Sequence, residues 1–201
     1  MRHRHNVFVS CYYGEDGDYK EYLEDMAAET GIFIDRSVQE YDIDDRGLSS
    51  EQIRKIIRDK YIRDSTVTIV ICGPNSRRRK FVDWEIHATM YDSPINHRGG
   101  LLAINTPESG NCTLTAPGDE YLIQGAYRYR EYHNQDWLED HFPNLPDRLF
   151  FNIMDGAPIS VVDWKDVYQD PGRLFELIHN AFARRNDFPY RMDIPLRKKN
   201  S

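Results

Sequence analysis

Apolar and polar positions alternate in blocks along the first half of the chain. Short apolar runs rich in β-branched residues predict strands at residues 6–11, 32–34, 66–72 and 101–104. Apolar residues at helical spacing predict intervening helices at residues 19–29, 51–63 and 80–91. The run TVTIVIC at 66–72 is typical of a strand buried on both faces of a parallel sheet. This alternation predicts an α/β fold with a parallel sheet and right-handed crossovers.

The second half follows a less regular pattern. Residues 106–146 are rich in Pro, Gly, Asn and Tyr, and we interpret them as an irregular insertion. Apolar runs at 149–153 and 160–164 predict final strands, and residues 173–185 predict a C-terminal helix. We therefore expect one domain over residues 1–201. Its parts are a core at about 5–105, the insertion, and final strands and a helix within 147–190.

Composition excludes several classes of protein. The 201 residues include 26 Lys and Arg against 33 Asp and Glu, so the net charge of −7 argues against a dedicated nucleic-acid binder. A mean hydropathy of −0.70 and the lack of any apolar run of about 18 residues argue against a membrane span. The basic start lacks the apolar core of a secretory signal, and the three cysteines lack zinc-site spacing. We expect a cytoplasmic protein with free thiols, in which Cys11 and Cys72 are small buried residues.

The lack of several known sequence motifs disfavours further classes of enzyme. The chain has no GxxxxGK[ST], no GxGxxG after the first strand and no GxSxG elbow, which disfavours P-loop, dinucleotide-binding and hydrolase activities. The acidic loop with Asp42, Asp44 and Asp45 lacks the rest of a calcium-binding loop, so we expect no metal site. Asp35 follows the second strand, whereas the acceptor of a receiver domain closes the third, where this chain has Cys72.

Glu85 is the most informative polar residue. At about 100° per residue, it falls near the middle of the apolar arc of the helix at 80–91. Asp83 and His87 fall on the opposite face. A carboxylate on a buried face is costly unless it is paired or faces a cavity. Glu85 is therefore either a paired or edge carboxylate, or a functional one.

The basic run at residues 77–80 begins the same helix. Four positive charges at a helix N-terminus oppose the helix dipole. They form either a solvated surface patch or a surface that faces an anionic ligand at the ligand-binding edge of the sheet.

The quoted motifs resemble a known family. VFVSCYYGEDGDY, FIDRSV, SSEQIRKIIRDKYIRDSTVTIVICG and RRRKFVDWEI together resemble the bacterial TIR-like family, in the branch that includes the signal-producing component of Thoeris anti-phage systems. The resemblance covers about residues 5–105. It implies a flavodoxin-like TIR fold and cleavage of the nicotinamide–ribose bond of NAD. It also implies that NAD is the substrate, with no separate cofactor, and that the product is often a cyclic ADP-ribose isomer that activates a downstream effector.

The resemblance also implies site residues. The catalytic Glu of the family maps onto Glu85. A Trp that many TIR domains carry four residues earlier is replaced here by Phe81, and a Trp stands at position 84 instead. The implied substrate-binding residues follow the first two strands or adjoin the glutamate: Ser10, Cys11, Tyr12, Tyr13, Asp35, Arg36, Ser37 and Trp84. The loop after the second strand is expected to close over the substrate.

The chemistry is plausible for these residues. Nicotinamide leaves as a neutral molecule from a cationic substrate, so a carboxylate in a dry cleft need only stabilise an oxocarbenium-like transition state. We expect NAD, an effector reached through a diffusible nucleotide, self-assembly and a phage-derived trigger as partners, and neither nucleic acid nor membrane. Two alternatives stay open: a non-catalytic TIR-like scaffold, and a nucleoside deoxyribosyltransferase-like enzyme.

Overall fold

A computed structural model describes residues 4–37, 47–94, 97–129 and 134–200. Within them, one seven-stranded sheet has the order β2-β1-β3-β4-β7-β5-β6. The pairs from β2 through β7 are parallel, whereas β5 runs antiparallel to β7. The strands are β1 (Asn6–Ser10), β2 (Ile34–Asp35), β3 (Val67–Cys72), β4 (Gly100–Asn105), β5 (Leu114–Thr115), β6 (Tyr127–Arg128) and β7 (Ser160–Asp163).

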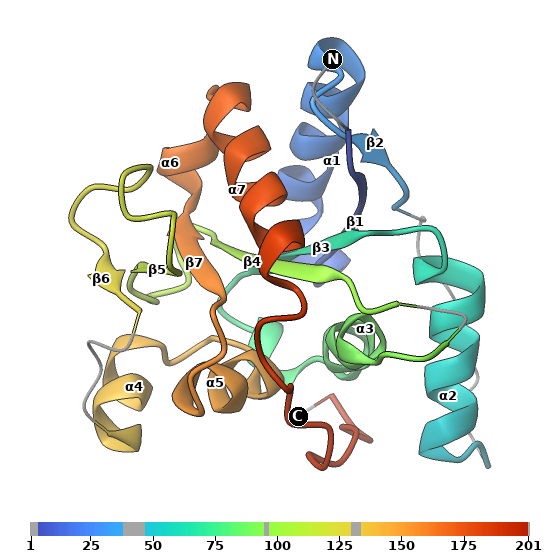
Figure 1. Ribbon diagram of the computed structural model, residues 1–201. Helices are drawn as coiled ribbons and strands as arrows, with labels where there is room; N and C mark the ends of the chain where they lie inside the picture. Colours follow the sequence, from blue (N-terminus) through green and yellow to red (C-terminus); the bar gives the residue numbers. More distant parts are fainter. Residues whose placement is uncertain (1–3, 38–46, 95–96, 130–133, 201) are drawn as a thin grey trace.

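Helices cover both faces of this sheet. In Figure 1, α1, α6 and α7 lie above it, and α2, α3, α4 and α5 lie below it. The described helices are α1 (Tyr13–Thr30), α2 (Ser50–Ile57), π-helical η1 (Arg58–Ile62), 3₁₀-helical η2 (Ser76–Arg78), α3 (Lys80–Met90), α4 (Gln135–His141), α5 (Asp147–Met154), α6 (Trp164–Val167) and α7 (Pro171–Arg184). The order β2-β1-β3-β4-β7 matches that of a flavodoxin-like sheet, which confirms the expected fold class.

The central strands separate two apolar layers. β3 and β4 are buried along their whole length. Because successive side chains of a strand face opposite ways, Ile69 and Ile71 pack with α1 and α7, while Val70 and Cys72 pack with α3 and α5. A third cluster, including Phe8, Ile57 and Trp84, fills the space between α2 and α3. The position of α3 is thus fixed by apolar packing on several sides.

The strand predictions for the first half are confirmed to within one or two residues. Ser49 caps α2 in a reciprocal capping box with Gln52, and Gly31 ends α1 with a φ of 65°. The expected start of the first helix at residue 19 is wrong, because α1 begins at Tyr13. Glu15 and Asp16 favour a helix start through the helix dipole, and buried packing of Gly17 outweighs the low helix propensity of glycine.

The prediction of a strand at residues 149–153 is wrong, since these residues lie in α5. A five-residue apolar run does not distinguish a strand from a buried helix. The buried residues Leu145, Leu149 and Ile153 are spaced by four, which is helical spacing. Only the run at 160–164 forms a strand, β7, which pairs in parallel with β4.

The expected irregular insertion contains short regular elements. β5 and β6 extend the sheet beyond β7, and α4 packs beside α5. One sheet therefore continues from the first half of the chain into the second. Among the described residues, no helix combines the length and the apolar character needed to cross a membrane.

Candidate active site

By the order of its strands, the crevice in which a fold of this type is expected to bind a ligand lies between β1 and β3. The chain moves outward in opposite directions from these two neighbouring strands, toward β2 and toward β4. α1, which follows β1, and α3, which follows β3, lie on opposite faces of the sheet (Figure 1). In open α/β sheets, ligands bind at such switch points, beyond the carboxyl ends of the strands. Ser10 and Gly73 stand at these two ends.

Glu85 lies on α3 at this crevice. Its side chain is 5% exposed, and the hydroxyl of Ser10 donates a hydrogen bond to its Oε2 atom. Burial raises the pKa of Glu85 to about 8, while the Ser10 hydrogen bond and the Lys20 ammonium act in the opposite direction. A carboxyl group with this pKa exchanges its proton near neutral pH, which is typical of functional sites.

Lys20 is a site residue that the sequence analysis missed. It lies on α1, is 6% exposed, and its Nζ is 3.7 Å from Oε1 of Glu24. Burial raises the pKa of Glu24, and a hydrogen bond with Ser37 lowers it. Lys20 precedes Leu23 by three residues and Ala27 by seven, so it falls on the apolar side of the predicted helix. On the wheel of the predicted helix, however, Lys20 falls only at the edge of the apolar arc, next to Ala27; the earlier start of α1, which also buries Asp16 and Gly17, brings it into the buried face.

Asp16 and the turn after β3 complete the crevice. Asp16 is 2% exposed and accepts a hydrogen bond from Oγ of Ser76 at 3.2 Å. Burial raises its pKa to about 6. A Cβ on Gly73 would lie 2.0 Å from Oδ1 of Asp16, so only glycine allows this approach. Two buried carboxyl groups, Asp16 and Glu85, therefore belong to the same end of the sheet.

Tyr12 and Arg79 stack beside this pair. The guanidinium carbon of Arg79 is 3.5 Å from the centre of the Tyr12 ring, and its Nη2 is 3.8 Å from Oε1 of Glu15. Asn75 donates to both carboxylate oxygens of Glu15 at 3.0 Å. Both Tyr12 and Arg79 are partly exposed, so the stack is open to solvent at the carboxyl edge.

The other predicted residues lie around this centre to different degrees. Cys11 is partly buried, and burial raises its pKa to about 12, so it is a thiol rather than a thiolate at neutral pH. Oγ of Ser37 accepts a hydrogen bond from the backbone of Val9 at 3.0 Å. Asp35 and Arg36 are exposed at the end of β2. Tyr13 is 44% exposed and donates to Glu21 along the surface of α1.

Trp84 does not lie at the crevice. It is 1% exposed, it packs in the cluster between α2 and α3, and its Nε1 donates to the carbonyl of Arg197 at 2.8 Å. Its ring meets Phe81 edge-on, with centroids 5.1 Å apart. Neighbouring residues on a helix point about 100° apart, so Trp84 faces the core while Glu85 faces Ser10. The position of Trp84 therefore does not support the implied contact with a substrate.

Asp83 also departs from the sequence analysis. The helical wheel placed Asp83 on the polar face, but it is 8% exposed. Its Oδ1 accepts a hydrogen bond from Nε of Arg148 at 2.8 Å. The backbone of Arg197 donates to the same carboxylate at 2.8 Å. Packing of α5 and the C-terminal tail against α3 buries this face, which a helix considered alone does not reveal.

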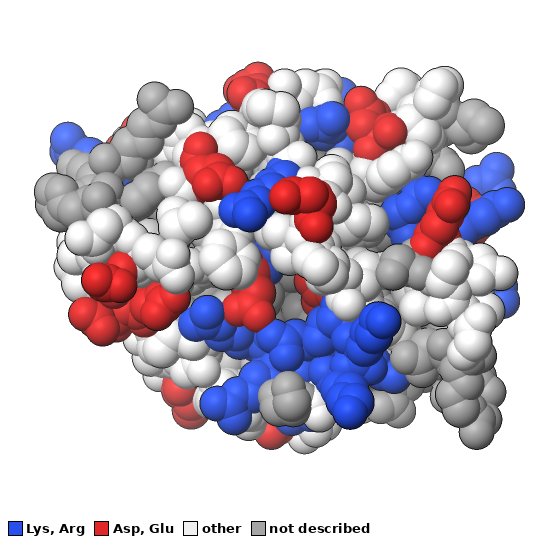
Figure 2. Space-filling model, turned by 90° about the horizontal axis from the view of Figure 1, so that it is seen from below, with Lys and Arg blue, Asp and Glu red and all other residues white. Residues whose placement is uncertain are grey.

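The basic run at 77–80 joins the C-terminal tail. Arg77 and Arg197 both bind Asp147, at 2.6 and 2.5 Å, and Oδ1 of Asn200 accepts from the backbone of Lys80. Figure 2 shows Lys and Arg side chains gathered in one patch on the lower face of the molecule. Part of the charge of this run is therefore used in internal ion pairs.

Two expectations fall partly or wholly outside the described residues. The loop expected to close over the substrate includes residues 38–46, and so does the acidic cluster Asp42, Asp44 and Asp45. Across the ranges that the structure describes, no group of three or more His, Cys, Asp or Glu residues could hold a metal ion.

Comparison with known proteins identifies the family. A family model described as "Thoeris protein ThsB, TIR-like domain" matches residues 8–111, just over half of the chain. This match includes the end of β1 and all of α1, β3 and α3, and with them Ser10, Lys20 and Glu85. A search of curated proteins found no match. The sheet order and the family match agree, and the chain belongs to the TIR-like domain family of the Thoeris defence protein ThsB.

Proposed function

We propose that this protein cleaves the nicotinamide–ribose bond of NAD, with Glu85 as the catalytic carboxylate. The observation that carries the proposal is the buried Glu85 carboxyl group, hydrogen-bonded by Ser10 at the switch point between β1 and β3. NAD is the substrate, and we propose no separate cofactor. The family match supports a role in defence, and we extend it here to an enzymatic reaction.

Charge governs the proposed reaction. The nicotinamide ring of NAD is cationic and leaves as a neutral molecule, so the leaving group needs no proton. Positive charge then develops on the ribose, as in glycoside hydrolysis. A carboxylate in a water-poor site stabilises that charge strongly, because the local dielectric is low. Glu85 is placed to perform this role once it is ionised.

The raised pKa of Glu85 is compatible with this role. Burial favours the neutral acid in the protein alone. A cationic substrate favours the ionised form, since opposite charges at close range lower the pKa of a carboxyl group. Binding of NAD would therefore release a proton from Glu85 and form an ion pair at the reacting carbon. Lys20 and Ser10 both lower the pKa of Glu85, which favours its ionised form near neutral pH.

The stack of Arg79 on Tyr12 suggests how the remainder of NAD is held. Arg79 directly precedes α3, and its charge lies at the open carboxyl edge of the sheet. We propose that it contacts the diphosphate and that Tyr12 contacts a base or ribose. Capture of the ribosyl cation by water gives ADP-ribose, whereas capture by a group of the same molecule gives a cyclic isomer. We propose the cyclic isomer as a diffusible messenger to a cytoplasmic effector, with a phage-derived trigger and self-assembly as its controls.

Metabolite analysis of cells tests this proposal. Cells expressing the wild-type chain or Glu85→Gln would be compared by chromatography and mass spectrometry, with and without phage. Glu29→Gln, at the exposed end of α1, is a matched control that removes one carboxylate from the surface. We expect an ADP-ribose isomer in wild-type and Glu29→Gln cells and none in Glu85→Gln cells. Unchanged NAD in all three strains would overturn the proposal in favour of a scaffold. Deoxynucleoside consumption would instead indicate a transferase.

A further inference from the structure

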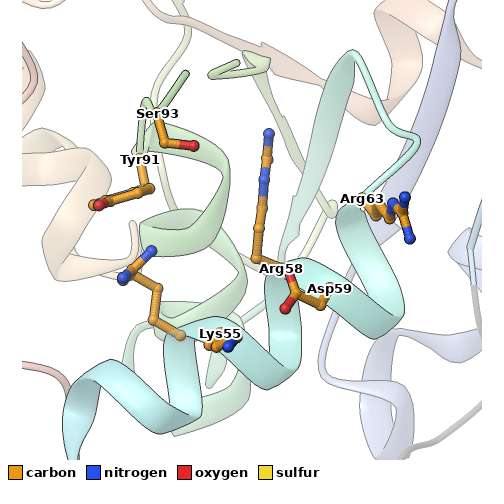
Figure 3. A pocket seen from close by; sticks show the side chains of 7 residues that line it. Lys55, Arg58, Asp59, Arg63, Tyr91 and Ser93 are labelled. Carbon is orange, nitrogen blue, oxygen red and sulfur yellow. The ribbon is translucent and has the colours of Figure 1, made fainter. Parts of the chain in front are cut away.

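A cavity lies away from Glu85, where α2 and η1 pack against the end of α3. Its volume is about 440 Å³, within the range of small-molecule sites. Figure 3 shows that Lys55, Arg58, Asp59 and Arg63 line it from one side, and Tyr91 and Ser93 from the end of α3. η1 leads toward β3, and α3 leads toward β4. The cavity is therefore at the amino-terminal edge of these strands, opposite the edge that holds Ser10 and Gly73.

The lining has an excess of positive charge. Arg54, Lys55, Arg58 and Arg63 face a single acidic lining residue, Asp59. The whole chain has a net charge of −7, so this cavity differs in sign from the average of the molecule. Like charges held together repel one another, and a bound anion would offset that repulsion.

Arg58 is the most constrained of these residues. It is 3% exposed, and its two terminal nitrogens donate to the carbonyls of Ala88 and His97. These bonds fix the guanidinium at the C-terminal end of α3, whose carbonyls carry partial negative charge. Its Nε has no hydrogen-bond partner among the described residues. Burial lowers the pKa of Arg58, while the carboxylates of Asp59 and Asp92 act in the opposite direction.

Two further features make the cavity a formed site. The guanidinium of Arg54 stacks on the Tyr91 ring, 3.6 Å from its centre, which holds both side chains in place. Arg58 begins a π-helical turn, and such turns occur frequently at functional sites because they are less stable than regular helix. The exposed cations Lys55 and Arg63, beside the half-buried guanidinium of Arg54, are suited to bind the oxygens of phosphate.

We propose that this cavity binds a phosphate group, either free or as part of a nucleotide. The volume accommodates a mononucleotide, and the Arg54–Tyr91 stack provides a flat surface beside the cationic groups. The inference does not depend on the proposed NAD cleavage, since it uses none of the residues at the carboxyl edge.

Isothermal titration with pyrophosphate and with AMP tests the proposal. The pocket variant Arg54→Gln/Lys55→Gln removes two lining charges, and the control Lys198→Gln/Lys199→Gln removes two charges from the exposed tail. Thermal unfolding checks that both variants fold. We expect saturable binding in the wild type and the control, and affinity weaker by about tenfold or more in the pocket variant, as for lost charged hydrogen bonds.

The two probes separate the sources of phosphate. Tighter binding of AMP indicates a nucleotide, and binding of pyrophosphate that is equal or tighter indicates that the phosphate groups alone are recognised. Either result supports the proposed site if the pocket variant binds the probes more weakly than the wild type does and the tail variant does not. Absence of saturable binding to the wild type, or equal losses in pocket and tail variants, would overturn the proposal. The same titrations with the Glu85→Gln variant keep the test independent of catalysis.

Discussion

Ser10 and Glu85 are 75 residues apart in the chain and share a buried hydrogen bond in which the hydroxyl donates to the carboxylate. The last residue of β1 thereby contacts the middle of α3 at the switch point of the sheet. A hydrogen bond to the charged form of an acid lowers its pKa, so Ser10 opposes the effect of burial on Glu85.

Ser10→Ala is expected to weaken catalysis through this pKa. Loss of the hydroxyl raises the pKa of Glu85 above about 8, so less of the free enzyme has the ionised carboxylate. We predict that kcat/KM at pH 7 falls by about tenfold or more, as for a lost hydrogen bond to a charged group. The pH profile of kcat/KM, which reports free-enzyme pKa values, measures the shift. Ser10→Thr keeps a hydroxyl and should retain more activity, whereas a profile identical in Ser10→Ala and wild type would contradict this role.

Glu85→Gln is expected to stabilise the fold at alkaline pH. The folded-state pKa of about 8 lies above the model value of 4.5. The folded state therefore binds more protons between these values, and stability contributed by neutral Glu85 is lost as pH rises. Glutamine resembles the neutral acid and still accepts from Ser10. Melting temperatures at pH 5 and pH 9 should show a larger gain for the variant at pH 9, by up to a few kcal/mol in unfolding free energy. An equal effect at both pH values would contradict the buried carboxyl.

Asp83→Asn is expected to destabilise the fold, in contrast to Glu85→Gln two residues away on α3. Asp83 pairs with the fully buried Arg148 and accepts from the backbone of Arg197. Removal of its charge leaves a buried guanidinium without its carboxylate, which costs about 3–5 kcal/mol. Chemical denaturation should show a lower midpoint for Asp83→Asn and no such loss for Glu85→Gln at pH 7. Equal stability of Asp83→Asn and wild type would show that the pair is not needed.

Gly73→Ala tests the close approach of the β3 turn to Asp16. The added Cβ would lie 2.0 Å from Oδ1 of Asp16, so the carboxylate or the turn must move. We predict a loss of about 1–3 kcal/mol and reduced product formation, since overpacking displaces the residues at the crevice. Gly172→Ala, where the nearest contact is 3.7 Å, is the control and should be tolerated. Asp16→Ala combined with Gly73→Ala should recover part of the loss, because the clash is with the carboxylate.

Trp84→Phe distinguishes a core residue from a substrate-binding one. The variant keeps an aromatic ring beside Phe81 but loses the Nε1 hydrogen bond to Arg197. We predict a loss of stability of about 1–3 kcal/mol, from the smaller ring and the missing hydrogen bond, with KM for NAD unchanged. A large increase in KM without loss of stability would place Trp84 at the substrate instead.

Much of the fold follows from local pattern. The buried runs that became β1, β3 and β4 are recognisable because strands covered on both faces need apolar residues throughout. The run at 149–153 misled because its helical spacing includes Leu145, outside the run, and because a short apolar segment fits either structure. The early start of α1 was hidden by two glycines, whose cost is offset by tertiary packing.

The site was predictable where a polar residue interrupts an apolar helical face. Glu85 satisfies this rule, whereas Lys20 lies at the edge of the apolar arc of its predicted helix and is buried because α1 begins earlier, at Tyr13. Asp83 and Trp84 were misjudged for a different reason. Their surroundings come from α2, α5 and the C-terminal tail, which are distant in sequence. The wheel shows which residues share a face of one helix, but not which other elements cover that face.

Release of nicotinamide is the most direct measure of the central claim. Lysates of phage-challenged cells that express the wild-type chain would be supplied with NAD labelled in the nicotinamide ring, beside lysates with Glu85→Gln or Glu29→Gln. We predict free labelled nicotinamide in the wild type and Glu29→Gln, and background release in Glu85→Gln. Equal release in wild-type and Glu85→Gln lysates, with both proteins folded and present in equal amounts, would contradict a catalytic role for Glu85.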